Sequence, residues 1–281
     1  MKKKCAVVFA LIIALICSFC IGMAVSNDNR KNSFDYRSGG EIGVIVTNYK
    51  GKAKNVKIPE KINGQTVIGV EATFTGNETV ESVTLPDTLQ YIYNDTFSLC
   101  KNLKKVTFSS ELLWICNSAF KDCTSLTEVN LPNKVEKIED SAFYGCTALK
   151  SVTFPQSLTR LEANAFGKCS SLTSVVVPKN VEYLDAGTFG MCTALKTVEI
   201  QTAGIIYSNV FDGCKSLSEI KFTNDKAQLY YIKGDDSVGC ITNEKVTFVA
   251  HKIDKQIYPN VQDLTPYRYS KIYDNISFRE M

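Results

Sequence analysis

The sequence predicts a β-rich solenoid of about seven repeats, and three observations support this prediction. Phenylalanine recurs every 23 residues, with 22 in the last interval. Several other positions keep the same spacing. A unit of this size is too small to bury its own apolar side, so that neighbouring units must stack to form one core. The phenylalanines that mark the repeats are Phe74, Phe97, Phe120, Phe143, Phe166, Phe189 and Phe211.

Each repeat contains two short apolar pairs that predict two strands. One pair stands nine and eleven residues after the phenylalanine, as at Val129 and Leu131. Alternation with a period of two is typical of a strand with one inward face. Proline follows this pair in several repeats, as at Pro132, and ends the strand because it donates no amide hydrogen. The second pair, such as Val135 and Ile138, predicts a short extended segment on the opposite wall.

The residues around each phenylalanine predict a brief helical or 3₁₀ turn. Phenylalanine, cysteine and leucine follow one another at intervals of three, which fits such a turn. Most repeats carry a helix-capping residue type two positions before the phenylalanine. These residues are Asp95, Ser118, Ser141, Asn164 and Asn209, with Gly187 once. The predicted class is therefore α/β, with parallel strands stacked in ladders and short helical turns between them.

Stacking predicts one buried ladder of side chains for each register of the repeat. The two clearest structural ladders are Phe97, Phe120, Phe143, Phe166 and Phe189, and Cys100, Cys123, Cys146, Cys169 and Cys192. We expect the thiols to stay reduced, because the Cβ atoms of parallel side chains lie too far apart for a disulfide. Cys116 and Cys240 lie outside the ladder, and the sequence leaves their state open.

The repeats resemble the bacterial BspA-type (Treponema-type) leucine-rich repeat family of surface proteins. The family pattern is A-F-x-x-C-x-x-L-x-x-V-x-L-P-x-x-L-x-x-I, and residues 119–138 and 142–161 match it nearly throughout. The resemblance covers about residues 36–223 and implies an α/β leucine-rich repeat solenoid. It also implies a surface-exposed or secreted protein that binds other proteins or host surfaces without catalytic residues. Asn77 stands where later repeats have cysteine, as expected of an end unit.

The N-terminus has the pattern of an export signal. Three lysines at positions 2–4 precede an apolar run from Cys5 to Val25. We expect cleavage near residue 26. Two other outcomes stay open: the run is long enough to remain as a membrane anchor, and Cys20 could carry a lipid, although Phe19 is bulky for a lipidation site. In each case the body of the protein lies outside the cytoplasm, at the cell surface or secreted.

These features divide the chain into five parts. We expect a signal peptide or anchor in residues 1–26, a polar spacer in 27–35 and an N-terminal cap in 36–72. Leucine-rich repeats follow in 73–223, and a C-terminal cap and tail in 224–281. Caps are expected at both ends because the last apolar layer of a solenoid must be covered.

Charge and composition argue against several functions. The formal charge of +3 comes from the three N-terminal lysines, so the cleaved chain is neutral and lacks the cation surplus that nucleic-acid binding needs. His251 is the single histidine, which leaves one candidate base and no multi-histidine metal site. We therefore expect no enzyme, no cofactor and no metal site. We expect a monomer that contacts a membrane only through residues 5–25, if these are uncleaved.

One outward row suggests where a ligand could bind. The position 17 residues after the phenylalanine should point outward, and it carries aromatic and cationic side chains. With one neighbour, the candidate ligand face is Tyr91, Tyr93, Trp114, Lys137, Arg160 and Tyr183. Aromatic and arginine residues are enriched in interface cores, and flat rings also stack on sugars. Ordinary wall residues that shield their neighbours would give the same pattern.

The sequence therefore predicts an exported binding or adhesion module. Its partner would be a protein, such as a host or matrix protein, or a glycan, recognised through an outer face of the solenoid. The alternative is a membrane-anchored structural or envelope protein without a soluble ligand.

Overall fold

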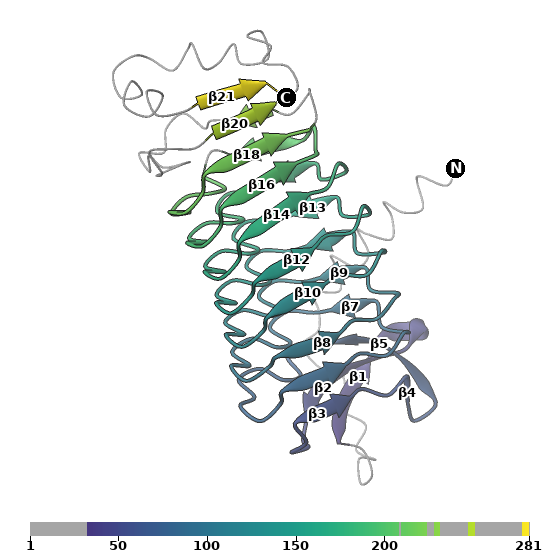
Figure 1. The fold of residues 1–281 in the computed structure, drawn as a ribbon. Coiled ribbons are helices and arrows are strands. Elements are labelled where there is room, and N and C mark those ends of the chain that lie inside the picture. Colours follow the sequence, from purple (N-terminus) through teal and green to yellow (C-terminus); the bar gives the residue numbers. More distant parts are fainter. Residues whose placement is uncertain (1–32, 208, 224–227, 231–246, 251–276, 281) are drawn as a thin grey trace, which may run out of the picture.

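The computed structural model describes residues 33–207, 209–223, 228–230, 247–250 and 277–280. The chain forms an elongated coil of about eight turns with a spacing of about 23 residues (Figure 1). The N-terminal cap adds a full turn to the seven repeats that the sequence predicts. The export signal expected in 1–26 lies outside the described residues, as does most of the expected C-terminal cap.

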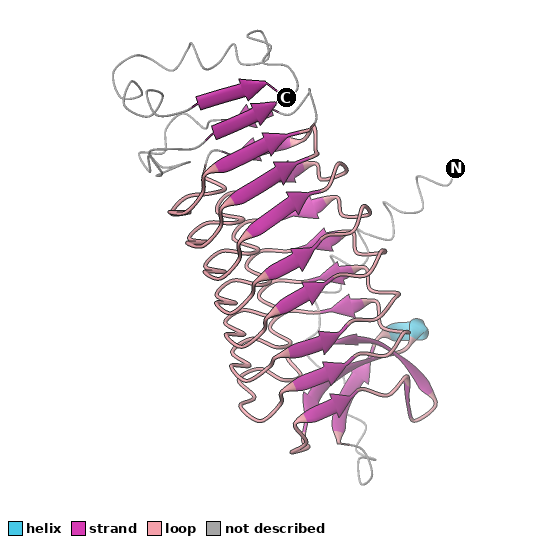
Figure 2. Ribbon diagram, viewed as in Figure 1, coloured by secondary structure: helices cyan, strands magenta, loops and turns pink. Residues whose placement is uncertain are grey.

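Strands make up nearly all of the regular structure (Figure 2). The one helix of the described residues is the 3₁₀ turn η1 (Gly40–Ile42), which precedes the repeats. The helical part of the α/β prediction is therefore not confirmed, whereas the stacked parallel strands are.

The N-terminal cap pairs directly with the first repeat. β1 (Phe34–Ser38) runs antiparallel to β2 (Val44–Tyr49), and β2 runs parallel to β5 (Gln65–Val70). β4 (Lys61–Ile62) forms a hairpin with β5, and β3 (Asn55–Lys57) pairs with the opposite side of the first repeat. β1 includes residues 34 and 35 of the expected spacer, because Phe34 is buried in the cap.

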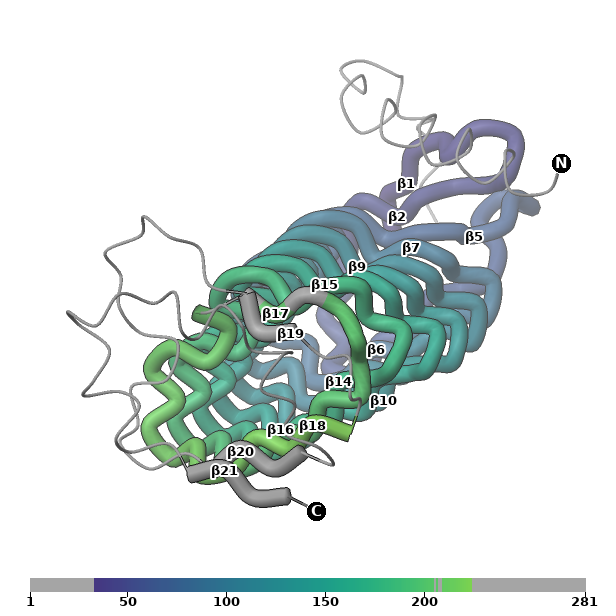
Figure 3. The backbone as a smooth tube through the Cα atoms, turned by 90° about the horizontal axis from the view of Figure 1, so that it is seen from above, coloured from purple at the N-terminus to yellow at the C-terminus, as the bar shows by residue number. Residues whose placement is uncertain are grey.

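Each repeat contributes one strand to each of two walls (Figure 3). We name the first the continuous wall, because its strands pair from β1 to β19 without interruption. Its repeat strands are β7 (Tyr91–Ile92), β9 (Trp114–Ile115), β11 (Lys137–Ile138), β13 (Arg160–Leu161), β15 (Tyr183–Leu184), β17 (Ile205–Tyr207) and β19 (Gln228–Tyr230). These are the second extended segments that the sequence predicts.

The other wall, which we name the segmented wall, consists of three separate sheets: β3-β6-β8, β10-β12 and β14-β16-β18-β20-β21. Its repeat strands are β6 (Ser82–Thr84), β8 (Lys105–Thr107), β10 (Glu128–Asn130), β12 (Ser151–Thr153), β14 (Ser174–Val177), β16 (Thr197–Ile200), β18 (Glu219–Phe222), β20 (Thr247–Ala250) and β21 (Ser277–Glu280). Their parallel pairing places residues of successive turns above one another.

The turn side of the coil, which leads from the continuous wall to the segmented wall, is not helical. The residue two before the phenylalanine has a left-handed backbone, with φ of 54° at Asp95, 55° at Ser118 and 53° at Asn164. A helix N-cap has an extended backbone instead. The expectation that these residues cap a helix was therefore wrong. Asp, Asn and Gly suit the position because they reach left-handed φ at the lowest cost.

A second left-handed residue stands two positions after the phenylalanine, as at Leu99, where φ is 62°. Two such residues within five positions prevent a helix. The backbone N–H groups donate to the next turn of the coil instead. Phe97 N donates to Ala119 O and Leu99 N to Lys121 O, both at 2.7 Å. These bonds give the coil a third hydrogen-bonded side.

The core is a ladder of stacked rings that both walls share. Neighbouring phenylalanine rings from Phe74 to Phe211 are nearly parallel, with centroids 4.8–5.9 Å apart. Phe97, Phe120, Phe143 and Phe166 are fully buried. Burial of each such ring contributes about 1.5–3 kcal/mol.

Candidate binding face

The structure brings most of the candidate ligand face into one row. The backbone register of the continuous wall pairs Tyr91 with Trp114, Trp114 with Lys137, Lys137 with Arg160, and Arg160 with Tyr183. Five of the six candidates therefore lie on consecutive turns. Tyr93 follows Tyr91 by two residues and lies beside this row.

One of the six candidates, Tyr91, is less accessible than the sequence suggests. Tyr91 is only 8% exposed, because the ring of Trp114 packs edge-on against it at 5.7 Å and the ring of Tyr93 lies at the same distance. Burial raises the pKa of Tyr91, and the nearby Glu136 and Cys116 raise it further. Tyr91 thus supports Trp114, which is itself partly exposed.

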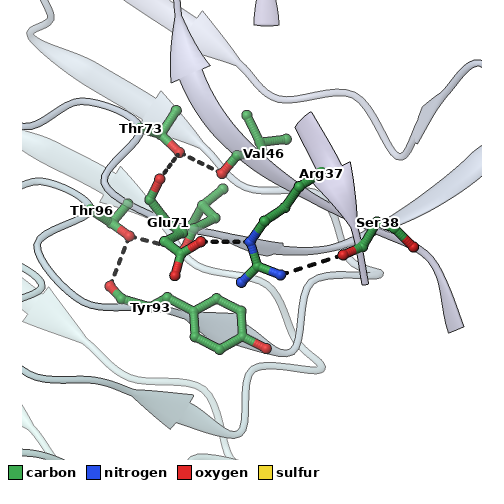
Figure 4. A network of polar contacts seen from close by, with 8 residues as sticks. Arg37, Ser38, Val46, Glu71, Thr73, Tyr93 and Thr96 are labelled. Carbon is green, nitrogen blue, oxygen red and sulfur yellow. Dashed lines mark hydrogen bonds and ion pairs between the residues drawn. The ribbon is translucent and has the colours of Figure 1, made fainter. Parts of the chain in front are cut away.

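Tyr93 belongs to a contact network with the N-terminal cap (Figure 4). The guanidinium carbon of Arg37 lies 5.9 Å from the centre of the Tyr93 ring, while Arg37 Nε donates to Glu71 Oε2 at 2.7 Å. The ring also packs against Gly69, where an added Cβ would lie 2.7 Å from a ring carbon. The small residue in β5 therefore provides space for the tyrosine.

Two buried threonines anchor the same network through the backbone. Thr96 Oγ1 donates to the carbonyls of Val70 at 2.9 Å and Tyr93 at 2.8 Å. Thr73 Oγ1 donates to Val46 O at 2.8 Å (Figure 4). These bonds connect the cap to the first repeats and fix the backbone that carries Tyr93.

Lys137 is engaged within the protein. Its Nζ atom lies 2.9 Å from Glu139 Oε1 and 2.8 Å from Glu162 Oε1. Burial alone would lower the pKa of Lys137, but the hydrogen bonds to Glu162 and Glu139 outweigh it and raise the pKa. Lys137 therefore neutralises carboxylates of its own wall. Of the two candidate cations, Arg160 is the exposed one.

Sequence reasoning missed a set of carboxylates on both sides of this row. They stand one residue before the row or two to three residues after it. These residues are Glu136, Glu139, Asp140, Glu162, Glu182 and Asp185. They were not assigned to the face because no single register is acidic in every repeat: Glu136 corresponds to Gln90, Leu113 and Thr159 in other turns. Charge counted over the whole wall would have found them.

The cysteine ladder has a structural role inside the coil. Each thiol from Cys100 to Cys214 donates a hydrogen bond to the backbone carbonyl of the ladder phenylalanine in the preceding turn, as Cys100 does to Phe74 O, at 2.9–3.3 Å. Burial raises the pKa of Cys100 to about 12 and holds the pKa of Cys123 and Cys146 well above the ordinary value. A thiol that stays protonated is a poor nucleophile, so the ladder is structural.

The remaining features considered are metal sites, membrane-spanning helices, the single histidine and the N-terminal apolar run. Within the described ranges, no group of three or more histidine, cysteine, aspartate or glutamate residues is arranged to hold a metal ion. Among the same residues, no helix is long and apolar enough to cross a membrane. His251 and the apolar run Cys5 to Val25 lie outside the described ranges.

The stacked turns, the inward aliphatic rows and the two parallel walls define a leucine-rich repeat solenoid. The sequence profile of the BspA type leucine rich repeat region matches the chain in six copies, over residues 42–166 and 114–237. The chain therefore belongs to the BspA-type leucine-rich repeat family, which confirms the resemblance seen in its repeats.

Solved structures of other bacterial leucine-rich repeat proteins are similar to this chain. A leucine-rich repeat protein of T. pallidum matches with a TM-score of 0.50 and 24% identity, over 84% of this chain and 94% of that one. A leucine-rich cell surface protein of Faecalibacterium prausnitzii matches with a TM-score of 0.42 and 19% identity, over 93% and 96%. The likeness to the T. pallidum protein shows a shared fold. No curated protein matches the sequence.

Proposed function

We propose that this chain is an exported binding module that recognises a protein or a glycan through the outer face of the continuous wall. The observation that carries the proposal is the register that places five residues on consecutive turns, which are Tyr91, Trp114, Lys137, Arg160 and Tyr183. A wall of hydrogen-bonded strands holds such side chains in place before a ligand arrives. Pre-organisation of this kind reduces the entropy lost on binding.

Trp114 and Tyr183 are the aromatic groups most suited to contact a ligand. Both are partly exposed, whereas Tyr91 is buried beneath Trp114. Tryptophan and tyrosine are enriched at interface hot spots, and the ring of Tyr91 packs against that of Trp114 and supports it. We assign Tyr91 and Tyr93 to the support of the face and the rings of Trp114 and Tyr183 to the contact, with Arg160 exposed between them.

We propose a location at the cell surface or in the surrounding medium. The three lysines at positions 2–4 and the apolar run from Cys5 to Val25 support export. The alternative, a membrane-anchored structural protein, rests on the length of the same run, which suffices to span a bilayer. Fractionation of producing cells distinguishes the two: recovery in the medium favours cleavage, and recovery in membranes favours the anchor.

We propose no catalytic activity. The thiols of the ladder are buried with raised pKa values, and the carboxylates of the continuous wall lie along an open face. Catalysis usually requires titratable groups that converge in a cleft.

The binding proposal is tested by paired variants on the two walls. Trp114→Ala with Tyr183→Ala removes the exposed rings of the continuous wall. Thr107→Ala with Thr153→Ala changes exposed residues of the segmented wall and serves as the control. The exported protein and both double variants are compared on arrays of purified extracellular proteins and glycans. Loss of binding by the first variant alone supports the proposal. Equal binding by all three proteins contradicts it.

A further inference from the structure

The outer face of the continuous wall changes character along the coil. At its N-terminal end lie the aromatic residues Tyr91, Tyr93 and Trp114. In the next three turns the same face carries six carboxylates and two cations. The carboxylates are Glu136, Glu139, Asp140, Glu162, Glu182 and Asp185, and the cations are Lys137 and Arg160. The face therefore has an excess of negative charge next to an aromatic anchor.

The negative charge is specific to this wall. The outward positions of the segmented wall between β3 and β18 carry three lysines and three glutamates, which balance. They are Lys57, Lys105 and Lys221, and Glu128, Glu199 and Glu219. A chain with a formal net charge of +3 thus has an acidic patch on the same face that carries its exposed rings. That coincidence argues for charge complementarity with a ligand.

A lysine of the same wall neutralises part of the acidic patch, and other carboxylates of the patch are available to a partner. Lys137 bridges Glu139 and Glu162 at 2.9 Å and 2.8 Å. Glu136 and Glu182 are exposed and form no ion pair among the described residues. Glu136 directly precedes Lys137, which is the register partner of Trp114, and its charge adds to the burial that raises the pKa of Tyr91. A cation beside Glu136 would therefore lie within reach of the aromatic anchor.

The dimensions of the face fit a short extended peptide. Trp114 and Tyr183 are separated by three strand spacings in the register of the wall. At about 4.8 Å per spacing this is roughly 14 Å. An extended chain rises about 3.3 Å per residue, so about four to five residues span the two rings. A basic side chain could stack on each ring, with the carboxylates between them.

We propose that the continuous wall recognises an extended, lysine- or arginine-rich segment of a partner protein. This inference rests on the proposed function and adds the chemistry of the ligand. The basic side chains stack on Trp114 and Tyr183 and pair with Glu136 and Glu182, while Arg160 weakens the binding. A neutral glycan would leave these carboxylates without a charged partner, and a sulfated glycan would be repelled by them.

Trp114 is a built-in reporter for this binding, because it is the single tryptophan of the chain. The probe is a six-residue peptide of alternating arginine and serine, which does not fluoresce itself. The exported protein, as recovered from the producing cells, is titrated with the peptide while Trp114 emission is followed. We expect a saturable change whose apparent Kd rises steeply with salt concentration. A peptide with glutamate in place of arginine is the matched control and should give no change.

Three variants test the assignment of charges. Glu136→Gln with Glu182→Gln should weaken peptide binding roughly five- to tenfold, as expected for the loss of two exposed ion pairs. Arg160→Gln should strengthen it several-fold, a gain that loss of folding cannot imitate. Glu128→Gln with Glu219→Gln on the segmented wall is the charge-matched control and should leave the apparent Kd unchanged.

Four outcomes would overturn the inference. The first is no change in Trp114 emission at millimolar arginine peptide and low salt. The second is an equal response to the glutamate peptide, and the third is an unchanged Kd in both the Glu136/Glu182 and the Arg160 variants. A neutral oligosaccharide that changes Trp114 emission when the arginine peptide does not would also overturn it. In that case the proposed binding function would stand, with a glycan as ligand.

Discussion

The continuous wall and the segmented wall are built from the same repeats, yet they differ in hydrogen bonding. Within the described residues, the continuous wall pairs strand to strand from β1 to β19, while the segmented wall is interrupted after β8 and after β12. At both interruptions a phenylalanine, Phe108 or Phe154, directly follows the strand. At the same position the neighbouring turns carry Leu85, Leu131 and Val177.

Ring size explains the two interruptions. The ring of Phe108 stands edge-on against Phe120 at 5.9 Å, and that of Phe154 against Phe166 at 5.3 Å, so each ring reaches into the following turn. Where the residue is Leu85, its amide donates to Thr107 O of the next strand at 3.0 Å. Among the described residues, the amides of Phe108 and Phe154 make no such bond. The wider ring separates the strands beyond hydrogen-bonding distance.

The comparison shows that the outer and inner faces of a wall tolerate different substitutions. Successive strands stay paired when the side chains on the outer face change, as the varied row from Tyr91 to Tyr183 shows. They do not stay paired when an inward residue has a large ring, unless the residue above it in the next turn is small. Phe222 occupies the same position, and β18 still pairs with β20, where its register partner is the smaller Ala250. The outer face is therefore where a sequence can vary to acquire binding.

The largest expected effect is the loss of both walls at alkaline pH. The folded protein raises the pKa of the ladder thiols, to about 12 at Cys100. Their contribution to stability is full below the unfolded pKa of about 8.5 and is lost as the pH rises toward the folded pKa. Each thiol contributes a slope of about 1.4 kcal/mol per pH unit. Burial raises the pKa of all six thiols from Cys100 to Cys214 or holds it high together with their neighbours, so their ionisation in the unfolded chain opposes folding more strongly as the pH rises.

We therefore expect cooperative unfolding at a pH of about 10, followed by circular dichroism and Trp114 emission. Because both walls share the ladder, the two signals should change together. Cys100→Ala with Cys146→Ala removes two of the titrating groups and should make the loss of stability with pH less steep. A wild-type stability that stays flat up to a pH of about 11 would contradict the role assigned to the thiols.

The second largest effect is expected from the shared phenylalanine ladder. Phe143 is fully buried and stacks on Phe120 and Phe166 with 4.9 Å between each pair of ring centres. Phe143→Ala should cost about 3–5 kcal/mol. Phe108→Ala, at a half-buried ring of the segmented wall, should cost clearly less. Urea unfolding compares the two variants, and an equal loss of stability in both would show that the stacked ladder is not the main support of the coil.

The sequence predicted the parts of the fold that repeat. The 23-residue spacing of phenylalanine, cysteine and the aliphatic pairs was sufficient to predict two walls and a shared core. It failed on the turn side, because Asp95, Ser118 and Asn164 are residue types that suit both a helix N-cap and a left-handed backbone. The recurrence of glycine two residues after the phenylalanine, at Gly145 and Gly213, was the signal for a left-handed backbone there.

The geometry of the candidate binding face was predicted only in part. Its row followed from the period, because residues one repeat apart must stack. The burial of Tyr91 and the pairing of Tyr93 with Arg37 could not be predicted, because they depend on ring packing between turns and on the distant N-terminal cap. Lys137 was expected to be available to a ligand, but Glu139 and Glu162 lie on two different turns and meet it only in the folded coil.

A third prediction tests the role of ring size directly. Leu131→Phe places a ring where β10 and β12 now pair, and it should open this pair at a cost of about 1–3 kcal/mol from overpacking. Phe108→Leu is the converse change and should let β8 approach β10. Hydrogen exchange measures both: protection of the amide at position 131 should fall in the first variant, and protection of the amide at position 108 should rise in the second. Unchanged protection at both positions would mean that something other than ring size interrupts the segmented wall.

The smallest effect concerns ion pairs beside the two walls. Lys137 is half-buried between Glu139 and Glu162, so Lys137→Gln leaves two neighbouring carboxylates without their cation and should cost about 1 kcal/mol after solvent screening. Lys104, which pairs with Glu81 beside the segmented wall, is much more exposed, and Lys104→Gln should leave the urea midpoint unchanged. High salt should reduce the effect of Lys137→Gln only slightly, because partly buried pairs are weakly screened. Equal effects of the two substitutions would show that Lys137 behaves as an ordinary surface lysine, available to a ligand after all.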